Sequence, residues 1–453
     1  MDLKEKRVLV VGLGKSGVAS ALFLKAHGAQ VTVSDTKSGD DLRNEIPTLL
    51  DHGITVETGG HGERTFRGQD LIVVSPGVPV DAPPLVQARS LGEMVIGEIE
   101  LAAQFLPGPI VAITGSNGKT TTTTLTGEIL TAGGLPTLVG GNIGTPAISL
   151  AERAKPESVI VLEVSSFQLE TIQSFHPKVA VVLNVTPDHL DRHGTLEAYV
   201  NAKARIFENQ TSEDFAVLNA DDSTCVAMAN RTRAQVFWFS RQKEVKRGAW
   251  VRDGAIVFRD GLGPEETVQR EIMLASEIPL KGAHNLENVL AAVCAGMLME
   301  CAPEKIRQAV RDFKAVEHRL EYVATLRGVD YYNDSKATNV DATIKALESF
   351  PANIHLILGG KDKGSDYSVL NDLLRQRVKR VYTIGAAAAK IESQIKNVEV
   401  VHAETLENAV RKANASAEPG DVVLLAPACA SFDQFKNYEQ RGQVFKEMVR
   451  RLA

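Results

Sequence analysis

The sequence has little cysteine and no excess of positive charge. Its 453 residues include four cysteines, Cys225, Cys294, Cys301 and Cys429, with neither a CxxC motif nor zinc-ligand spacing among them. This argues against a disulfide scaffold and favours a reducing compartment. The formal net charge of −6 argues against a dedicated nucleic-acid-binding protein, because such proteins usually carry a basic surface.

Long hydrophobic runs are also missing. No apolar run approaches the roughly 18 residues that a membrane-spanning helix requires. The first residues, MDLKEKRVLVVG, pass from charged side chains directly into a strand pattern, unlike a signal peptide. We therefore expect a cytoplasmic protein with no membrane insertion and no nucleic-acid partner.

A glycine-rich turn between two strand patterns opens the chain. Residues 7–35, RVLVVGLGKSGVASALFLKAHGAQVTVSD, predict a strand, a Gly-x-Gly-x-x-Gly turn (Gly12, Gly14, Gly17), a helix, a second strand and an acid. Taken alone, this pattern is typical of a dinucleotide-binding fold. One further strand pattern, DLIVVSPG, follows, and 97 residues are too few for the complete two-lobed fold. We predict half of a doubly wound domain.

The length corresponds to about three domains of roughly 150 residues. Pro-Gly-Pro at 107–109 marks a linker, and strand and helix patterns alternate beyond it. Later in this unit, QVFWFS and GAWVRDGAIVFRD predict antiparallel strands, the latter with Asp253-Gly254 as a hairpin turn. We predict an α/β protein with three domains in series: a Rossmann-like half-fold (1–97), a central P-loop ATPase-like domain (98–315) and a C-terminal Rossmann-like domain (316–453).

The stretch IVAITGSNGKTTTTT predicts a phosphate-binding loop. Backbone N–H groups of such a loop cradle phosphates, Lys119 reaches the β- and γ-phosphates, and the Thr120 hydroxyl binds Mg²⁺. The strict pattern places a glycine where this chain has Ile113. A chance Gly-Lys-Thr match would lack the preceding strand and the following helix, so we predict ATP binding. The predicted loop consists of Gly115, Ser116, Asn117, Gly118, Lys119, Thr120 and Thr121.

Three polar residues follow two further strand patterns of the same unit. Glu163 ends VIVLE, and Asp188 and His189 lie in NVTPDHLDRH. The carboxyl ends of parallel strands are where ligands gather, and oxygen ligands suit Mg²⁺ better than the nitrogen of histidine does. Taken alone, Glu163 reads as a solvated strand-end acid and His189 as a loop residue that caps a helix, and only the phosphate loop favours a metal role. Lys203, in YVNAKARIFEN, reads by itself as a solvated helix lysine.

Several longer motifs resemble those of the Mur ligases, the ATP-dependent amide-forming enzymes of bacterial peptidoglycan synthesis. They occur in a fixed order over nearly the whole chain: TGSNGKTTT, LEVSSFQLE, NVTPDHLDRH, KARIFEN, KGAHNLENVLAA, EHRLE and NDSKATN. Three features are most similar to the branch that adds D-glutamate to UDP-N-acetylmuramoyl-L-alanine: VGLGKSG with SDT, NDSKATN, and ACASFDQFKNYEQRG.

The resemblance implies a monomeric cytoplasmic ligase of cell-wall biogenesis, linked to cell shape and division. ATP would phosphorylate the substrate carboxylate, and the D-glutamate amine would attack the acyl phosphate. It also implies two Mg²⁺ ions, with Mn²⁺ as a substitute, and CO₂ that carbamylates Lys203. Carbamylation turns a cation into the hard oxygen ligand that Mg²⁺ prefers. The implied metal ligands are Thr120, Glu163, His189 and Lys203, and the implied catalytic residues are Lys119, Glu163, His189 and Lys203.

The same resemblance implies three further sets of binding residues. Those for the UDP-linked substrate are Gly14, Lys15, Ser16, Asp35, Thr36, Lys37, Ser75, Gly77 and Asn142. Those for the adenine, ribose and phosphates of ATP are Asn285, Arg319 and Asp334. Those for D-glutamate are Lys336, Thr338, Lys363, Ser431, Phe432 and Tyr438. Without their motifs, these residues would read as caps, turn residues, helix starts, solvated lysines or members of ion pairs.

Three other functions stay open. A nicotinamide-dependent oxidoreductase would need a second half-fold where the chain instead has a phosphate loop. A non-catalytic regulator would use ATP only to switch conformation. A sister ligase, of Mur type or folylpolyglutamate type, would add a different amino acid. A diamino-acid substrate would need an acid for its distal amine, whereas Lys363 and Ser431 favour a distal carboxylate.

Overall fold

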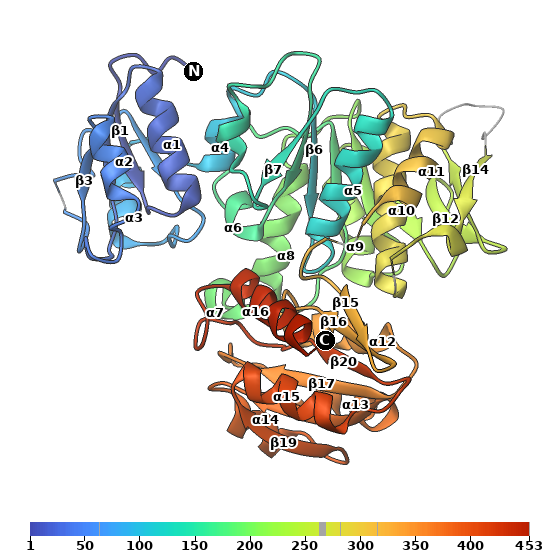
Figure 1. Ribbon diagram of the computed structural model, residues 1–453. Helices are drawn as coiled ribbons and strands as arrows, with labels where there is room; N and C mark the ends of the chain where they lie inside the picture. The colour runs from blue at the N-terminus through green and yellow to red at the C-terminus, as the bar shows by residue number, and fades with distance from the viewer. Residues whose placement is uncertain (63, 262–268, 281, 315, 453) are drawn as a thin grey trace. The chain divides into compact units, whose positions relative to one another are not determined.

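The computed structural model describes residues 1–62, 64–261, 269–280, 282–314 and 316–452. These residues form two compact units, Met1–Ala275 with Asn288–Val310, and Ser276–Glu287 with Arg311–Ala453. Two separate sheets belong to the first unit and one sheet to the second, so three α/β parts succeed one another along the chain (Figure 1). No helix within the described ranges is long and apolar enough to cross a membrane.

The first sheet is parallel and Rossmann-like, with the strand order β3-β2-β1-β4-β5. Its strands are β1 (Arg7–Val11), β2 (Gln30–Ser34), β3 (Thr55–Glu57), β4 (Leu71–Val74) and β5 (Val95–Gly97). Its helices are α1 (Lys15–Ala26), α2 (Ile46–Asp51), α3 (Pro83–Ser90) and α4 (Glu98–Ala103). The sequence pattern identified β1, β2 and β4, whose apolar runs are buried as parallel strands require. The short outer strands β3 and β5 carried too little pattern to be recognised.

The second sheet has nine strands in the order β14-β13-β12-β11-β10-β9-β6-β8-β7. They are β6 (Ile110–Thr114), β7 (Thr137–Gly141), β8 (Val159–Glu163), β9 (Val179–Val182), β10 (Phe215–Asn219), β11 (Gln235–Ser240), β12 (Gly248–Arg252), β13 (Ala255–Arg259) and β14 (Gln269–Leu274). The helices are α5 (Lys119–Ala132), α6 (Ser166–Leu169), α7 (Leu190–His193), α8 (Leu196–Ala204), α9 (Ser223–Met228), α10 (Ala283–Leu298) and α11 (Pro303–Asp312). Helix α10 begins in the second unit and ends in the first.

The predicted antiparallel pairing of QVFWFS is wrong. This segment is β11, and it runs parallel to both β10 and β12. Strand periodicity reports which faces are buried and not the direction of the neighbouring strand, so the pattern could not settle the pairing. The hairpin prediction is confirmed, because β12 and β13 are antiparallel. Asp253 and Gly254 both have positive φ, 51° and 79°, as a type I′ turn requires.

The third sheet has six strands in the order β15-β16-β20-β17-β18-β19. They are β15 (Glu321–Leu326), β16 (Val329–Asn333), β17 (Ile354–Gly359), β18 (Val378–Ile384), β19 (Glu399–Glu404) and β20 (Val422–Leu425). The helices are α12 (Val340–Glu348), α13 (Asn371–Arg377), α14 (Ala388–Gln394), α15 (Leu406–Ser416) and α16 (Tyr438–Arg451). All pairs are parallel except β15 with β16. The carboxyl ends of β16, β20 and β17 therefore lie side by side.

All four cysteines are free and buried. Burial raises the pKa of the Cys294 thiol to about 12 and that of the Cys301 and Cys429 thiols to about 11. Burial likewise raises the pKa of Cys225 well above its usual range. The thiols are therefore protonated at neutral pH and unreactive.

Two glutamates at the start of α4 are buried, and their pKa values shift in opposite directions. Burial raises the pKa of Glu98 to about 7, and one of its oxygens accepts a hydrogen bond from the Ile148 N–H at 2.8 Å. Burial also acts to raise the pKa of Glu100, but the N–H groups of Gln173, Ser174 and Phe175 and the Ser174 hydroxyl together lower it. Glu98 thus keeps its proton longer in the folded protein, and Glu100 loses its proton earlier.

We expect Glu98→Gln to change the pH dependence of stability. The folded protein holds the Glu98 proton to a higher pH than the unfolded chain does, so the wild type loses stability as pH rises from about 4.5 to about 7. An amide cannot ionise, so the variant lacks this loss. Its free energy of unfolding, measured with denaturant and expressed relative to wild type, should be on the order of 2–3 kcal/mol higher at pH 8 than at pH 4.5. Glu100→Gln is the matched control and should lose stability at pH 8. If the free energy of unfolding of Glu98→Gln, relative to wild type, instead fell between pH 4.5 and pH 8, the raised pKa of Glu98 would be contradicted.

Candidate active site

The predicted phosphate loop joins β6 to α5, and side-chain hydrogen bonds hold its backbone. Gly118 precedes the first residue of α5 with a φ of +85°, a conformation that favours glycine. The side chain of Asn184 accepts a hydrogen bond from the Asn117 N–H at 2.8 Å and donates one to the Asn117 carbonyl at 3.1 Å. The ammonium of Lys119 donates to the carbonyls of Gly115 and Ser116, at 2.8 and 2.9 Å. The loop is therefore ordered as a closed turn at the start of a helix.

Glu163 lies at the centre of the polar groups around this loop. It is the last residue of β8, and its side chain is buried. One carboxylate oxygen accepts a hydrogen bond from the Thr120 hydroxyl at 2.8 Å, and the other accepts one from the Asn142 amide at 2.9 Å. The structure thus brings together three residues that the sequence predicted from separate motifs.

Lys203 is fully buried, which contradicts its reading as a solvated helix lysine. Its side chain leaves α8 and donates to the Gly115 carbonyl at 2.9 Å, and the ammonium lies 4.5 Å from the centre of the Tyr199 ring. Burial first, and then the charge of Lys119, lower the pKa of Lys203 well below its usual range. The neutral form of this amine is therefore more accessible than that of a lysine in water.

Asp188 and His189 follow β9 at the same edge of the sheet. The charges of Asp188 and Glu163 both act on Lys203 and oppose the lowering of its pKa, so both acids lie near its amine. The Asp188 carboxylate accepts a hydrogen bond from the His189 N–H at 2.9 Å and lies 3.7 Å from the His189 Nε2. The His189 ring also meets the Phe167 ring edge-on at 4.9 Å. His189 precedes α7 with a positive φ of 52°.

The Gly-x-Gly-x-x-Gly turn follows β1, and its neighbours brace it. A Cβ at Gly17 would lie 1.9 Å from the Gly12 carbonyl oxygen, so the turn has no room for another residue there. The Asp35 carboxylate accepts hydrogen bonds from the N–H groups of Leu13 and Lys37, at 2.7 and 2.8 Å. The Ser75 hydroxyl donates to the Gly12 carbonyl at 2.7 Å. Of the remaining predicted residues, Gly14, Thr36 and Gly77 lie in the same three strand-end segments, and Lys15 and Ser16 begin α1.

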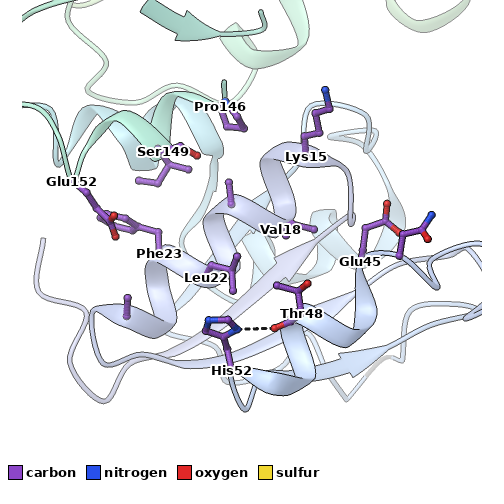
Figure 2. Close-up of a pocket in the computed structure, with 14 residues that line it drawn as sticks. Lys15, Val18, Leu22, Phe23, Glu45, Thr48, His52, Pro146, Ser149 and Glu152 are labelled. Carbon is purple, nitrogen blue, oxygen red and sulfur yellow. Dashed lines mark hydrogen bonds between the residues drawn. The ribbon is translucent and has the colours of Figure 1, made fainter. Parts of the chain in front are cut away.

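A cavity of about 650 Å³ runs beside α1 and has Lys15 at one end (Figure 2). Val18, Leu22 and Phe23 of α1 form its apolar wall, and Ser149 faces them from the segment after β7. Among the residues predicted for the site, Lys15 is the one that lines this cavity. The cavity is therefore separate from the phosphate loop and its acids.

In the second unit, Arg319 and Asp334 are close and partly neutralise each other. Burial raises the pKa of Asp334 to about 6, and the charge of Arg319 acts to lower it. Burial, with the charges of Lys345 and Arg319, lowers the pKa of His284 to about 3. Asn285 follows His284 in the first turn of α10. The charge of half-buried Arg319 thus acts on Asp334 and on His284, the neighbour of Asn285 in the chain.

The residues predicted for D-glutamate come from the ends of three adjacent strands. Lys336 and Thr338 follow β16, Lys363 follows β17, and Ser431 and Phe432 follow β20. The ammonium of Lys336 lies 5.3 Å from the centre of the Tyr438 ring at the start of α16. Lys336 and Ser431 lie in turns and not at helix starts. Ser431 is buried, whereas Lys363 and Phe432 are exposed.

Arg441 joins two of these strand-end segments and was not predicted. Its guanidinium is buried and donates to the Ser335 hydroxyl and carbonyl, at 3.0 and 2.8 Å, and to the Cys429 carbonyl at 3.1 Å. Burial lowers its pKa to about 10, so it remains charged at neutral pH. The NYEQRG part of the quoted C-terminal motif contained it, but only the structure shows its partners.

Three residues of the first unit were also missed. Asn184 holds the phosphate loop, and Tyr199 places its hydroxyl 3.2 Å from the Ser116 hydroxyl. A Cβ at Gly118 would lie 2.1 Å from the Asn288 side-chain oxygen, so Asn288 packs directly on the loop. All three residues lie in motifs described above, NVTPDH, YVNAK and HNLEN, but a different residue of each motif was predicted for the site.

Comparisons with protein families match three successive models. The Mur ligase MurD-like N-terminal domain matches residues 6–97, the Mur ligase middle domain matches residues 113–296, and the Mur ligase glutamate ligase domain matches residues 318–429. The three matches follow the three sheets in order.

Similar proteins extend the match over the full length. The chain is 69% identical to a UDP-N-acetylmuramoylalanine–D-glutamate ligase of Koribacter versatilis, covering 100% of this chain and 99% of that protein. It is 60% identical to the protein of the same name from Acidobacterium capsulatum, covering 99% and 97%. Among solved structures, UDP-N-acetylmuramate–alanine ligase from Thermotoga maritima shares the fold, with a TM-score of 0.61 at 19% identity and coverage of 99% and 100%. The chain belongs to the Mur ligase family.

Proposed function

We propose that this protein is the ATP-dependent ligase that adds D-glutamate to UDP-N-acetylmuramoyl-L-alanine. The observation that carries the proposal is the 69% identity, over the whole chain, to a protein named for this activity. The buried network around the phosphate loop supports it. We further propose that the enzyme acts as a cytoplasmic monomer in peptidoglycan precursor synthesis, with the associated roles in cell shape, division and the cell cycle.

The reaction needs activation because a carboxylate is a poor electrophile at neutral pH. In the proposed sequence, a carboxylate oxygen of the L-alanine attacks the γ-phosphorus of ATP, and the bond to ADP breaks. The neutral amine of D-glutamate then attacks the acyl carbon of the resulting acyl phosphate. The tetrahedral adduct loses phosphate and a proton and becomes an amide. The products are ADP, phosphate and the extended UDP-linked substrate.

Lys119 and the backbone N–H groups that open α5 have the chemistry to hold the triphosphate. The lysine now donates to two carbonyls of its own loop, within reach of the turn that would receive the phosphates. Exchanging those carbonyls for phosphate oxygens would keep these two hydrogen bonds of the ammonium and pair it with negative charge. The developing negative charge would thus meet groups that are already in position.

The donor set around Glu163 fits Mg²⁺. The Thr120 hydroxyl and the Glu163 carboxylate are oxygen ligands already 2.8 Å apart, and the Asn142 amide fixes the second carboxylate oxygen. Thr120 and Glu163 would hold one ion, and His189 with carbamylated Lys203 a second, with Mn²⁺ as a substitute. When bound, these ions would neutralise phosphate charge.

Lys203 has the properties that carbamylation requires. Only a neutral amine attacks CO₂; the new N–C bond forms and a proton leaves, which gives a carbamate anion. Burial favours the neutral amine, as the lowered pKa shows. Unmodified Lys203 and Lys119 repel each other, whereas a carbamate would attract the Lys119 ammonium. The modification would thus replace the repulsion between buried Lys203 and half-buried Lys119 with an attraction.

We propose that the glycine-rich turn binds the UDP end of the substrate. Gly14 precedes α1, and a Cβ there would meet nothing within 4 Å, so the turn is open to a ligand. The helix N-terminus attracts an anion, and Lys15 and Lys37 add positive charge. Asp35 and Ser75 act by holding the backbone of the turn. Asn142 would lie near the reacting carboxyl.

We propose that the second unit binds adenosine and D-glutamate. Asn285, Arg319 and Asp334 would hold the adenosine part and phosphates of ATP. The two carboxylates of D-glutamate would meet Lys336, Thr338 and Lys363 with the buried Ser431, beside Phe432 and Tyr438. Arg441 would keep the segments after β16 and β20 in register.

The identity of the amine is tested by phosphate release from ATP in the presence of UDP-N-acetylmuramoyl-L-alanine. We expect the kcat/KM for D-glutamate to exceed those for L-alanine, L-lysine and another diamino acid by at least about 100-fold. A site built for two carboxylates leaves charged groups unpaired when one of these other amines binds. Release with L-lysine but not D-glutamate would identify a sister ligase. ATP binding without any amine-dependent release would identify a non-catalytic regulator.

Lys203→Ala should lower kcat by at least about 100-fold, because it removes a proposed metal ligand. Lys155→Ala, which changes an exposed lysine of the same unit, is the control and should keep full activity. With ¹³C-labelled bicarbonate, the wild type should show a carbamate carbon signal by NMR that Lys203→Ala lacks. Full activity of Lys203→Ala, or of wild type freed of CO₂, would rule out the carbamate.

A further inference from the structure

Arg319 lies in an unfavourable stretch of backbone. The residues on either side of it, His318 and Leu320, both have positive φ, 65° and 39°. Residues other than glycine rarely adopt this conformation, and it persists only where surrounding contacts enforce it. Such positions cluster where a side chain must be presented to a ligand.

Contacts from three residues hold this turn. The Glu321 carboxylate accepts a hydrogen bond from the His318 N–H at 2.9 Å. The Asn333 amide contacts the His318 ring nitrogen at 2.9 Å, and the Asp334 carboxylate accepts a hydrogen bond from the Leu320 N–H at 3.3 Å. The turn is thus fastened to β15 and to the end of β16, the segment that carries the predicted ligand-binding residues.

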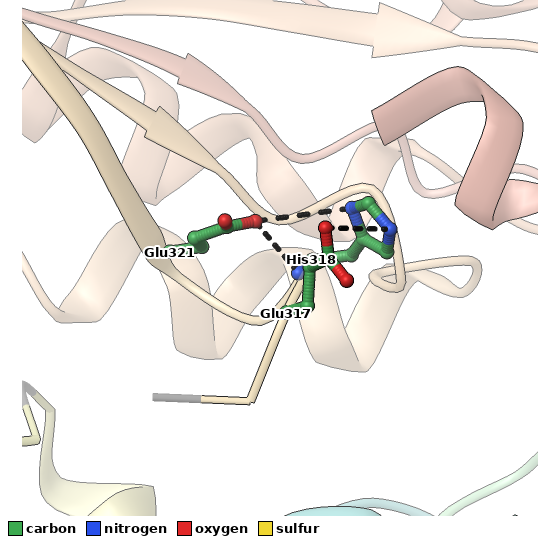
Figure 3. Close-up of side chains that lie close together, drawn as sticks. All are labelled: Glu317, His318 and Glu321. Atoms are coloured by element: carbon green, nitrogen blue, oxygen red, sulfur yellow. Dashed lines mark hydrogen bonds and ion pairs between the residues drawn. The ribbon is translucent and has the colours of Figure 1, made fainter. Parts of the chain in front are cut away.

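The glutamates of the turn surround a buried ammonium. Glu317, His318 and Glu321 place ligand atoms within 4.8 Å of one another, an arrangement that could hold a metal ion (Figure 3). The ammonium of Lys446, from α16, instead pairs with both glutamates, and it lies 3.0 Å from the Glu321 oxygen. Its side chain is only 6% exposed. The cation that neutralises these carboxylates is therefore supplied by the chain itself.

Arg319 keeps a donor available within this framework. Its Nε is buried, and no described residue accepts a hydrogen bond from it. Burying an unpaired guanidinium donor is costly unless a ligand completes it. Because the turn aims Arg319 at the same region as Asp334 and His284, an anionic ligand at that point would pair with it.

We propose that Lys446 is a positioning residue for Arg319. Its ammonium holds Glu321, Glu321 fixes the His318 N–H, and the strained turn then presents the Arg319 guanidinium to the phosphates of ATP. The inference rests on the proposed function in that Arg319 binds ATP. Lys446 itself contacts the two glutamates and acts on the nucleotide only through the turn.

The test compares Lys446→Met and Lys446→Arg in the full chain. We expect Lys446→Met to raise the KM for ATP at least about tenfold while the KM for UDP-N-acetylmuramoyl-L-alanine stays within about twofold. Lys446→Arg keeps the cation and should restore the KM for ATP to within about threefold. Lys379→Met is the matched control, because Lys379 also pairs with two acids of the second unit, Glu418 and Asp421. It should leave the KM for ATP unchanged.

A double-mutant cycle separates positioning from simple loss of stability. If Lys446 acts through Arg319, then Arg319→Lys with Lys446→Met should bind ADP no more weakly than Arg319→Lys alone, by calorimetry. Additive effects, or unchanged ADP binding in Arg319→Lys, would overturn the proposal. So would Zn²⁺ binding by the wild type that Glu317→Gln abolishes. The ligase function is judged independently by D-glutamate-dependent phosphate release, so each idea can fail alone.

Discussion

The candidate site depends on the carboxylate of Glu163 at the end of β8. Because β8 lies between β6 and β7, its final side chain reaches the segments that follow both neighbours, Thr120 on one side and Asn142 on the other. Two hydrogen bonds from these residues fix both oxygens of a buried acid. The parallel sheet thus sets the spacing of the polar groups, and the network sets their orientation, before any ligand arrives.

The same dry environment determines the state of Lys203. A lysine in water remains protonated far above neutral pH, whereas this one has a backbone carbonyl, an aromatic ring and a second lysine as neighbours. Carboxylates nearby oppose the effect of burial without cancelling it. Unmodified Lys203 is a buried amine. In the proposed carbamylated form, it would be a ligand that complements its surroundings.

Local patterns predicted the parts of the fold that local chemistry determines. Buried apolar strands, the Gly118 loop and the Asp253-Gly254 hairpin each follow from a few neighbouring residues. The direction of β11 did not, because it depends on partners that periodicity does not identify. Lys203 looked like a solvated helix lysine, although its small neighbours Ala202 and Ala204 suggested close packing, because lysines on helix faces are usually exposed. The roles of the individual site residues came from the order of motifs, and they stay predictions.

Long-range contacts explain the residues that were missed. Arg441 bonds to Ser335 across 106 positions of the chain, and Lys446 to Glu321 across 125. The burial of every thiol has a practical consequence of another kind. A single cysteine placed on the surface would be the one site open to maleimide dyes, with no native cysteine to remove first. Pairs of such sites, one in each compact unit, would allow fluorescence measurements of the distance between the two units.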